Sequence, residues 1–147
     1  MTAWFRQFCI YVSDIDATIR FYETLGLSCT SRTQITDDIE EAMIENPERG
    51  AWIQLAHDRS KPDSVQPGTS VWKLYVYTDD CQGLYDKAIA AGYKSFMAPE
   101  RLERWPVLMA YIEDPDGYLV ELLQRDTPAT PGGAGGSVRD QNVDQNV

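Results

Sequence analysis

The chain has 147 residues, of which 43% are apolar and 24% charged, which suits one globular domain or two small halves sharing a core. A formal net charge of −10 without a basic cluster argues against a nucleic-acid partner. No apolar run reaches the roughly 18 residues of a membrane span, so we expect a cytoplasmic protein without a membrane partner. The three cysteines lack CxxC spacing and favour free thiols in a reducing compartment.

The first half of the chain predicts strands and one helix in the order βαβββ. Residues 5–12 are rich in β-branched and aromatic side chains and predict a strand. Ser13 or Asp14 is a suitable N-cap for a helix that ends near Leu25, and Gly26 supplies the residue after its end. Three further strands are expected at residues 27–35, 39–45 and 51–56, with turns at 37–38 and 46–50.

The second half repeats this order, and the two copies align without a gap at an offset of 66 residues, so that Gln7 corresponds to Lys73. The turn Asp114-Pro115-Asp116-Gly117 predicts a hairpin, because Pro fixes φ and Gly takes a positive φ. The expected elements are strands at 71–77, 93–97, 107–113 and 118–123 and a helix at 80–91 that ends before Gly92. We divide the chain into a first βαβββ module (1–56), a linker (57–69), a second module (70–125) and a disordered tail (126–147).

Strand alternation gathers polar and aromatic side chains on one face of the first strand of each module, while the other face packs under the helix. The gathered residues are Gln7, Cys9 and Tyr11 in the first half and Lys73, Tyr75 and Tyr77 in the second. Such a mixture suits a ligand cavity. The last strands also correspond, with one residue of slippage, so that Gln54 and Glu121 interrupt apolar strands at equivalent places.

Each of the four polar residues at these repeat-equivalent positions also has an ordinary structural explanation. Gln7 would be solvated at a strand end, and Lys73 would point outward from an edge strand. Gln54 and Glu121 would belong to a half-exposed sheet face. The symmetry of the repeat favours one shared site over these separate explanations.

Two motifs resemble the vicinal oxygen chelate superfamily, which includes glyoxalase I, bleomycin-type resistance proteins, extradiol dioxygenases and methylmalonyl-CoA epimerase. The motifs are Tyr11-Val12-Ser13-Asp14 with Phe21-Tyr22 and Leu25-Gly26, and the closing segment from Glu113 to Leu122. The resemblance covers about residues 5–125. It implies an α+β fold in which two βαβββ modules form an eight-stranded, open barrel-like sheet with a concave ligand cavity.

Metal-using members of this family place one ligand on the first and last strand of each module, which corresponds here to Gln7, Gln54, Lys73 and Glu121. Lys73 departs from the family pattern, since His is expected there. A protonated Lys73 offers no lone pair and repels a dication, and the adjacent Glu121 opposes its deprotonation. We therefore expect a Lys73–Glu121 ion pair and no metal cofactor. The single histidine, His57, is expected in a solvated loop, and extradiol dioxygenase activity is excluded because it needs two histidines.

Two functions remain open. The first is a glyoxalase-like lyase or isomerase acting next to a carbonyl of a small molecule, with Glu121 as general base and Lys73 polarising the oxygen. The second is a binding protein that sequesters an aromatic or cationic small molecule, which the acidic surface and the Trp and Tyr side chains suit, although core and rim packing explains those aromatics equally well. The substrate-binding candidates are Gln7, Gln54, Tyr11, Tyr75 and Trp105, the last as a rim or lid residue. The carboxylate of Glu121 favours the enzyme, and a homodimer is expected.

Overall fold

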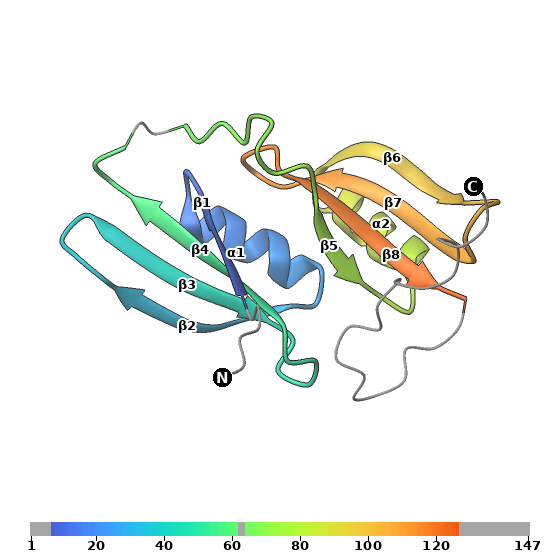
Figure 1. Cartoon of the computed structure of the whole chain (residues 1–147), viewed down its shortest axis with the longest axis horizontal. Coiled ribbons are helices and arrows are strands. Elements are labelled where there is room, and N and C mark those ends of the chain that lie inside the picture. Colours follow the sequence, from blue (N-terminus) through green and yellow to red (C-terminus); the bar gives the residue numbers. More distant parts are fainter. Residues whose placement is uncertain (1–6, 62–63, 127–147) are drawn as a thin grey trace, which may run out of the picture.

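The computed structural model describes residues 7–61 and 64–126 (Figure 1). Trp4, the predicted strand start at residue 5 and the predicted tail after Asp126 lie outside the described residues. None of the helices in the described part has the length and apolarity needed to cross a membrane.

Two βαβββ modules follow one another along the chain, as the sequence predicted. The first contains β1 (Gln7–Tyr11), α1 (Ile15–Thr24), β2 (Ser28–Gln34), β3 (Ile39–Glu45) and β4 (Trp52–Asp58). The second contains β5 (Leu74–Tyr77), α2 (Cys81–Ala90), β6 (Lys94–Arg101), β7 (Val107–Glu113) and β8 (Leu119–Arg125). Strands β3 and β7 have the predicted bounds, β5 begins later than expected, and β4, β6 and β8 continue past their predicted ends.

Both helices begin and end on repeat-equivalent signals. The side chain of Asp14 accepts a hydrogen bond of 2.9 Å from the backbone N–H three residues later, and Asp80 does the same at the start of α2. Gly26 and Gly92 follow the helix ends with φ of 82° and 92°, a left-handed conformation that favours glycine. The predicted starts and ends of both helices are therefore confirmed.

The strands form two four-stranded sheets, ordered β1-β4-β3-β2 and β5-β8-β7-β6. In each sheet the first strand of the module is an edge strand that pairs in parallel with the last. The two sheets lie side by side along the long axis, each with its helix against one face (Figure 1). The predicted α+β class and its two modules are confirmed, and the sheets are not closed into a barrel.

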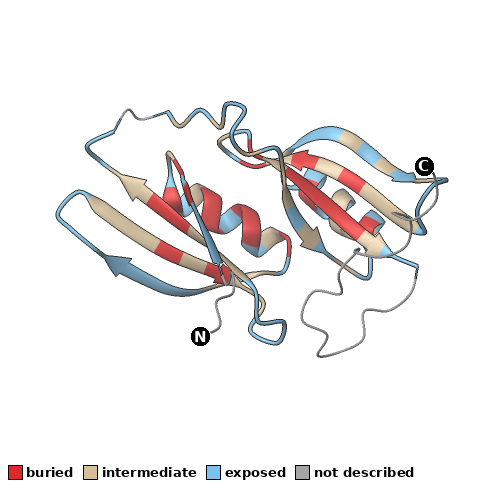
Figure 2. Ribbon diagram, in the orientation of Figure 1, coloured by how far each residue is buried: buried red, intermediate tan, exposed pale blue. Residues whose placement is uncertain are grey.

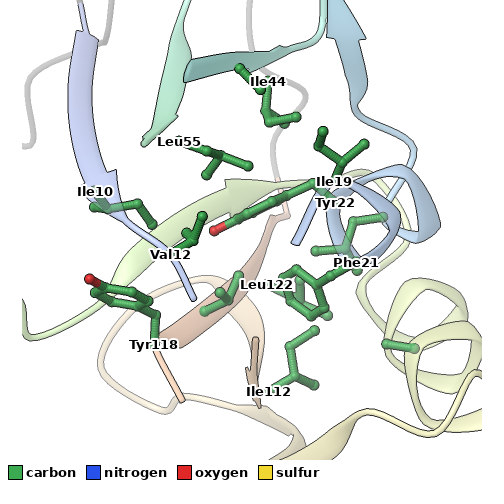
Figure 3. Close-up of a cluster of buried hydrophobic side chains, with 14 of the residues drawn as sticks. Ile10, Val12, Ile19, Phe21, Tyr22, Ile44, Leu55, Ile112, Tyr118 and Leu122 are labelled. Carbon is green, nitrogen blue, oxygen red and sulfur yellow. The ribbon is translucent and has the colours of Figure 1, made fainter. Parts of the chain in front are cut away.

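One hydrophobic core joins the two modules, because the two helices contact each other and each packs on its own sheet. Phe21 and Tyr22 of α1 are almost completely buried, and the ring of Phe21 meets that of Tyr93 edge-to-face at 4.8 Å between centroids. Figure 3 shows the ring of Phe21 directed toward Leu122 and Ile112 of the second module, whereas the ring of Tyr22 points toward Val12. Burial falls off toward β1, β2, β5 and β6, whose residues are exposed or half-buried apart from Ile10 (Figure 2).

Asp114, the first residue of the β7–β8 turn, is a buried carboxylate near the first module. Its Oδ1 accepts hydrogen bonds from the backbone N–H groups of Asp116 and Tyr118 at 3.0 and 2.8 Å. Its Oδ2 and the hydroxyl oxygen of Tyr22 are buried without a hydrogen-bond partner within the described part of the chain. Burial raises the pKa of Asp114 from 3.8 to about 6, against the opposing effect of the backbone hydrogen bonds.

Replacing Asp114 with Asn is expected to flatten the pH dependence of stability. A carboxyl group with a raised folded-state pKa contributes stability that is fully present below its unfolded pKa and is lost as the pH rises through its folded pKa. From 3.8 to about 6, this loss amounts to roughly 3 kcal/mol at neutral pH. Urea unfolding at acidic and neutral pH should show that the free energy of unfolding of the variant increases relative to that of the wild type as the pH rises. A constant difference between the two proteins would contradict a raised pKa.

Candidate functional site

The four repeat-equivalent polar residues form two pairs, one in each module. Gln7 of β1 donates from Nε2 to Oε1 of Gln54 on β4 at 2.7 Å. The Nζ atom of Lys73, just before β5, lies 2.5 Å from Oε2 of Glu121 on β8. Within residues 7–61 and 64–126, no hydrogen bond or ion pair joins one pair to the other. The structure thus pairs Gln7 with Gln54 and Lys73 with Glu121, and it does not gather all four residues in one group.

The predicted ion pair between Lys73 and Glu121 is present and shielded from solvent, with side chains 10% and 4% exposed. Glu121 points away from α2, since its neighbours Val120 and Leu122 belong to the core and alternate with it along the strand. A buried ammonium and carboxylate each carry a large desolvation cost, and each compensates the other only while both are charged. The pair is therefore a charged cluster on the sheet face away from the helix.

Tyr111 completes this cluster and was not among the residues predicted for the site. It lies on β7 directly opposite Glu121, and its hydroxyl accepts from Lys73 and donates to Glu121 Oε2, both at 3.0 Å. The sequence carried a signal for it, because counting back from the predicted hairpin turn places residue 111 opposite residue 121 on the same face. The group of Lys73, Tyr111 and Glu121 is called the lysine cluster below.

Lys73 also lies against aromatic rings. Its Nζ is 4.3 Å from the ring centroid of Trp72 and 4.8 Å from that of Tyr75. Burial lowers the pKa of Lys73, but hydrogen bonds to Glu121, Tyr111 and Tyr75 outweigh it and raise the pKa well above its ordinary value. Burial also raises the pKa of Tyr111. Lys73 is therefore a permanent ammonium donor at neutral pH, and Tyr111 is a neutral hydroxyl.

The remaining predicted residues have different surroundings. Tyr75 pairs with Glu121 across the parallel β5–β8 ladder and so belongs beside the lysine cluster. The side chain of Tyr11 is exposed on β1, and Trp105 lies in the turn between β6 and β7 with its ring 4.9 Å from the guanidinium carbon of Arg104. Within the described residues, neither Tyr11 nor Trp105 makes a hydrogen bond or ring contact with the two pairs.

His57 does not lie in a solvated loop, and that expectation is wrong. Strand β4 continues through His57 to Asp58, and the ring Nδ1 lies 3.1 Å from the backbone carbonyl oxygen of Val12. A cleft of about 280 Å³ lies elsewhere, between residues 92–94 and the turn at 113–117. None of the predicted site residues lines it.

Comparison with known proteins identifies the family. A family model described as the Glyoxalase/Bleomycin resistance protein/Dioxygenase superfamily matches residues 4–122. The chain belongs to this superfamily. The resemblance seen in the closing segment and the helix motif is therefore confirmed.

Similar members of the superfamily include enzymes named for lactoylglutathione. A probable lactoylglutathione lyase of Vibrio cholerae is 26% identical over 117 residues, 77% of this chain and 84% of that protein. A probable chloroplastic lactoylglutathione lyase of Arabidopsis thaliana is 29% identical over 124 residues, 82% of this chain and 35% of that protein. The crystal structure of glyoxalase I from Zea mays superposes with a TM-score of 0.73 at 27% identity. That match covers 83% of this chain and 45% of the maize chain, so the chain spans about half the length of the maize enzyme.

The expectation that the protein uses no metal cofactor is overturned by these relatives, because glyoxalase I enzymes depend on zinc or nickel. The side chains at the four equivalent positions nevertheless fit a divalent metal poorly, since they supply two amide oxygens, one carboxylate and an ammonium. The described residues also contain no group of three or more His, Cys, Asp or Glu side chains that could hold a metal ion. The relatives therefore indicate a metal-dependent enzyme, whereas the side chains at the four positions fit a divalent metal poorly.

Proposed function

We propose that this protein is a glyoxalase-like lyase or isomerase that moves a proton next to a carbonyl group of a small molecule. The observation that supports it is the lysine cluster, a buried carboxylate held between an ammonium and a hydroxyl on the sheet face away from α2. Such a cluster combines a base with two donors suited to an oxyanion. The names of the relatives point to a thioester or hemithioacetal of glutathione as the first substrate to test.

The proton transfer assigns one role to each residue of the cluster. Glu121 takes the proton from the carbon next to the carbonyl, and the electron pair of that C–H bond moves to the carbonyl oxygen. The ammonium of Lys73 and the hydroxyl of Tyr111 then turn their hydrogen bonds from Glu121 to the resulting enolate oxygen. Glu121 returns the proton to the former carbonyl carbon, the hydroxyl proton of the hemithioacetal passes to the enolate oxygen, and a new C=O bond forms at the carbon that lost its hydrogen, so no atom is gained or lost.

Product analysis in deuterium oxide tests this assignment. The protein is incubated with glutathione and the corresponding 2-oxoaldehyde, and lactoylglutathione is followed by NMR. Turnover with partial deuterium at the new C–H position is expected, because a carboxylate base exchanges its proton with solvent. A thermal-shift screen with glutathione adducts, acyl-CoA esters and aromatic antibiotics runs in parallel, since a bound ligand stabilises the fold. Strong stabilisation by an aromatic or cationic compound without any turnover would instead favour a sequestering protein.

We further propose that the protein is a cytoplasmic homodimer whose site joins the first module of one copy to the second module of the other. Strands β1 and β5 are sheet edges, and exposed edges are surfaces on which another chain can pair. Large aromatic side chains on and next to these edges are exposed, which is typical of an interface: Tyr11, Trp72, Tyr75 and Tyr77. The three cysteines are free, which suits a reducing compartment.

Mixing two impaired variants is expected to restore activity at a substrate concentration well below the KM of either variant. Gln54→Leu damages the first-module pair and Glu121→Gln damages the lysine cluster, so a heterodimer of the two has one intact site and one doubly damaged site. Random exchange of subunits should yield about a quarter of wild-type activity, because half of the dimers are heterodimers and each has one of two sites intact. Activity is measured after the variants have been unfolded and refolded together. Separate refolding of each variant is the control, and a mixture no more active than its parents would indicate sites built within single chains.

A further inference from the structure

The first-module pair is part of a longer hydrogen-bonded chain across three strands. The indole Nε1 of Trp52 donates to Oε1 of Gln7 at 2.7 Å, and Nε2 of Gln7 donates to Oε1 of Gln54 at 2.7 Å. Nε2 of Gln54 then donates to Oε2 of Glu41 at 2.5 Å. Glu41 lies on β3 opposite Ala56, which makes it the diagonal neighbour of Gln54 on the same sheet face.

One end of this hydrogen-bonded series can only donate a hydrogen bond, and the other end can only accept one. An indole N–H donates and never accepts, while an ionised carboxylate accepts and never donates. A glutamine amide between such ends has one satisfactory orientation, because a flip places oxygen against oxygen or N–H against N–H. The orientation of Gln7 and Gln54 is therefore set by Trp52 at one end and Glu41 at the other.

We propose that Glu41 is a positioning residue that fixes the amide orientation of Gln54 and, through it, of Gln7. The functional part of this proposal rests on the proposed function, in which these two amides bind the ligand. With Glu41 in place, each amide NH₂ group donates one hydrogen to the next residue of the hydrogen-bonded series. Its other hydrogen can then be donated to an oxygen atom of the ligand. A carbonyl or carboxylate group is the ligand chemistry that such donors recognise.

The charge of Glu41 also bears on Cys9, which pairs with Gln54 in the β1–β4 register. Burial and, to a smaller extent, the charge of Glu41 raise the pKa of the Cys9 thiol. The thiol is therefore held in its neutral form next to the two amides.

The test uses NMR of the full chain labelled with ¹⁵N, with Trp52→Phe to assign the indole resonance. Glu41→Ala is expected to shift the indole N–H signal of Trp52 and the side-chain NH₂ signals of Gln7 and Gln54. The effect on Trp52 would be indirect, because the indole donates to Gln7 whereas Glu41 accepts from Gln54. Glu40→Ala is the matched control, since Glu40 is the neighbouring residue on the same strand and pairs with Arg32 at 2.6 Å. It should leave the three signals in place.

Two results would overturn the proposal. One is an unchanged indole signal of Trp52 in Glu41→Ala, together with a shifted indole signal in Gln7→Ala. This result would show that Glu41 has no effect on the hydrogen bond between Trp52 and Gln7. The other concerns Glu41→Gln in the Trp52→Phe background, where the donor-only end is already absent and residue 41 can now both donate and accept. It should double or broaden the Gln54 NH₂ signals, and sharp wild-type signals would show that the carboxylate does not set the orientation.

Kinetics separate this proposal from the proposed function. If the wild type turns over, Glu41→Ala should raise KM about tenfold with a smaller change in kcat, since the amides bind the ligand and do not transfer the proton. An unchanged KM in a protein whose Trp52 and glutamine signals have shifted would reject the ligand-binding role alone. A wild type without any turnover would reject the proposed function and leave the NMR result on amide orientation standing.

Discussion

Replacing Glu121 with Gln is expected to lower turnover by about 10²- to 10⁴-fold, which is the range for loss of a general base. The amide cannot take a proton from carbon, but its oxygen still accepts from Lys73 and Tyr111, so these hydrogen bonds are kept although Lys73 loses its counter-charge. Affinity for a bound product or substrate analogue should change little. Turnover is measured by the NMR assay and affinity by isothermal titration calorimetry on the same preparation.

Glu113→Gln is the matched control for this variant. Glu113 lies on β7 and faces Lys94 at a distance of 3.8 Å, in a pair whose lysine side chain is 81% exposed. Its loss should leave turnover near the wild-type value. If Glu121→Gln also kept wild-type turnover, the assignment of Glu121 as the base would be wrong.

Replacing Lys73 with Met is expected to cost about 3–5 kcal/mol of the free energy of unfolding, because the carboxylate of Glu121 is left buried and unpaired. The lysine and glutamate side chains are 10% and 4% exposed, so solvent cannot take the place of the missing partner. Adding Glu121→Gln should recover most of this loss, since the double variant buries no charge. Urea unfolding of the wild type, both single variants and the double variant gives the coupling energy directly.

Lys94→Met tests whether the cost depends on burial. Its pair with Glu113 is largely solvated, and exposed pairs contribute little, so a change within about 0.5 kcal/mol is expected. Equal losses for Lys73→Met and Lys94→Met would contradict the buried ion pair. A double variant no more stable than Lys73→Met would show that the loss comes from packing of the lysine stem.

The local signals in the sequence were reliable because each depends on a few neighbouring residues. Asp14 and Asp80 cap their helices, and Gly26 and Gly92 follow them with positive φ. Strand alternation also placed Glu121 on the face away from its helix. The Lys73–Glu121 pair followed from the repeat, which identified the two positions before any contact was known.

Residues that meet across strands were harder to predict. Tyr111 and Glu41 join the site through the β7–β8 and β3–β4 registers, and a register is settled only when the strands pair. His57 was misplaced because β4 continues past its predicted end. The cofactor expectation failed for a different reason: it rested on one lysine, whereas the metal-dependent relatives are recognised over most of the chain.

The sequence by itself determined the two βαβββ modules, their helix ends and the four equivalent polar positions, because helix caps, turns and alternation act over a few residues. Only the tertiary structure decided that these positions form two separate pairs and that Tyr111 and Glu41 complete them. The physical reason is that partners across strands and between sheets depend on register and on packing of the shared core. Apart from the β7–β8 register, which can be counted from the hairpin turn at 114–117, those are properties of the whole chain.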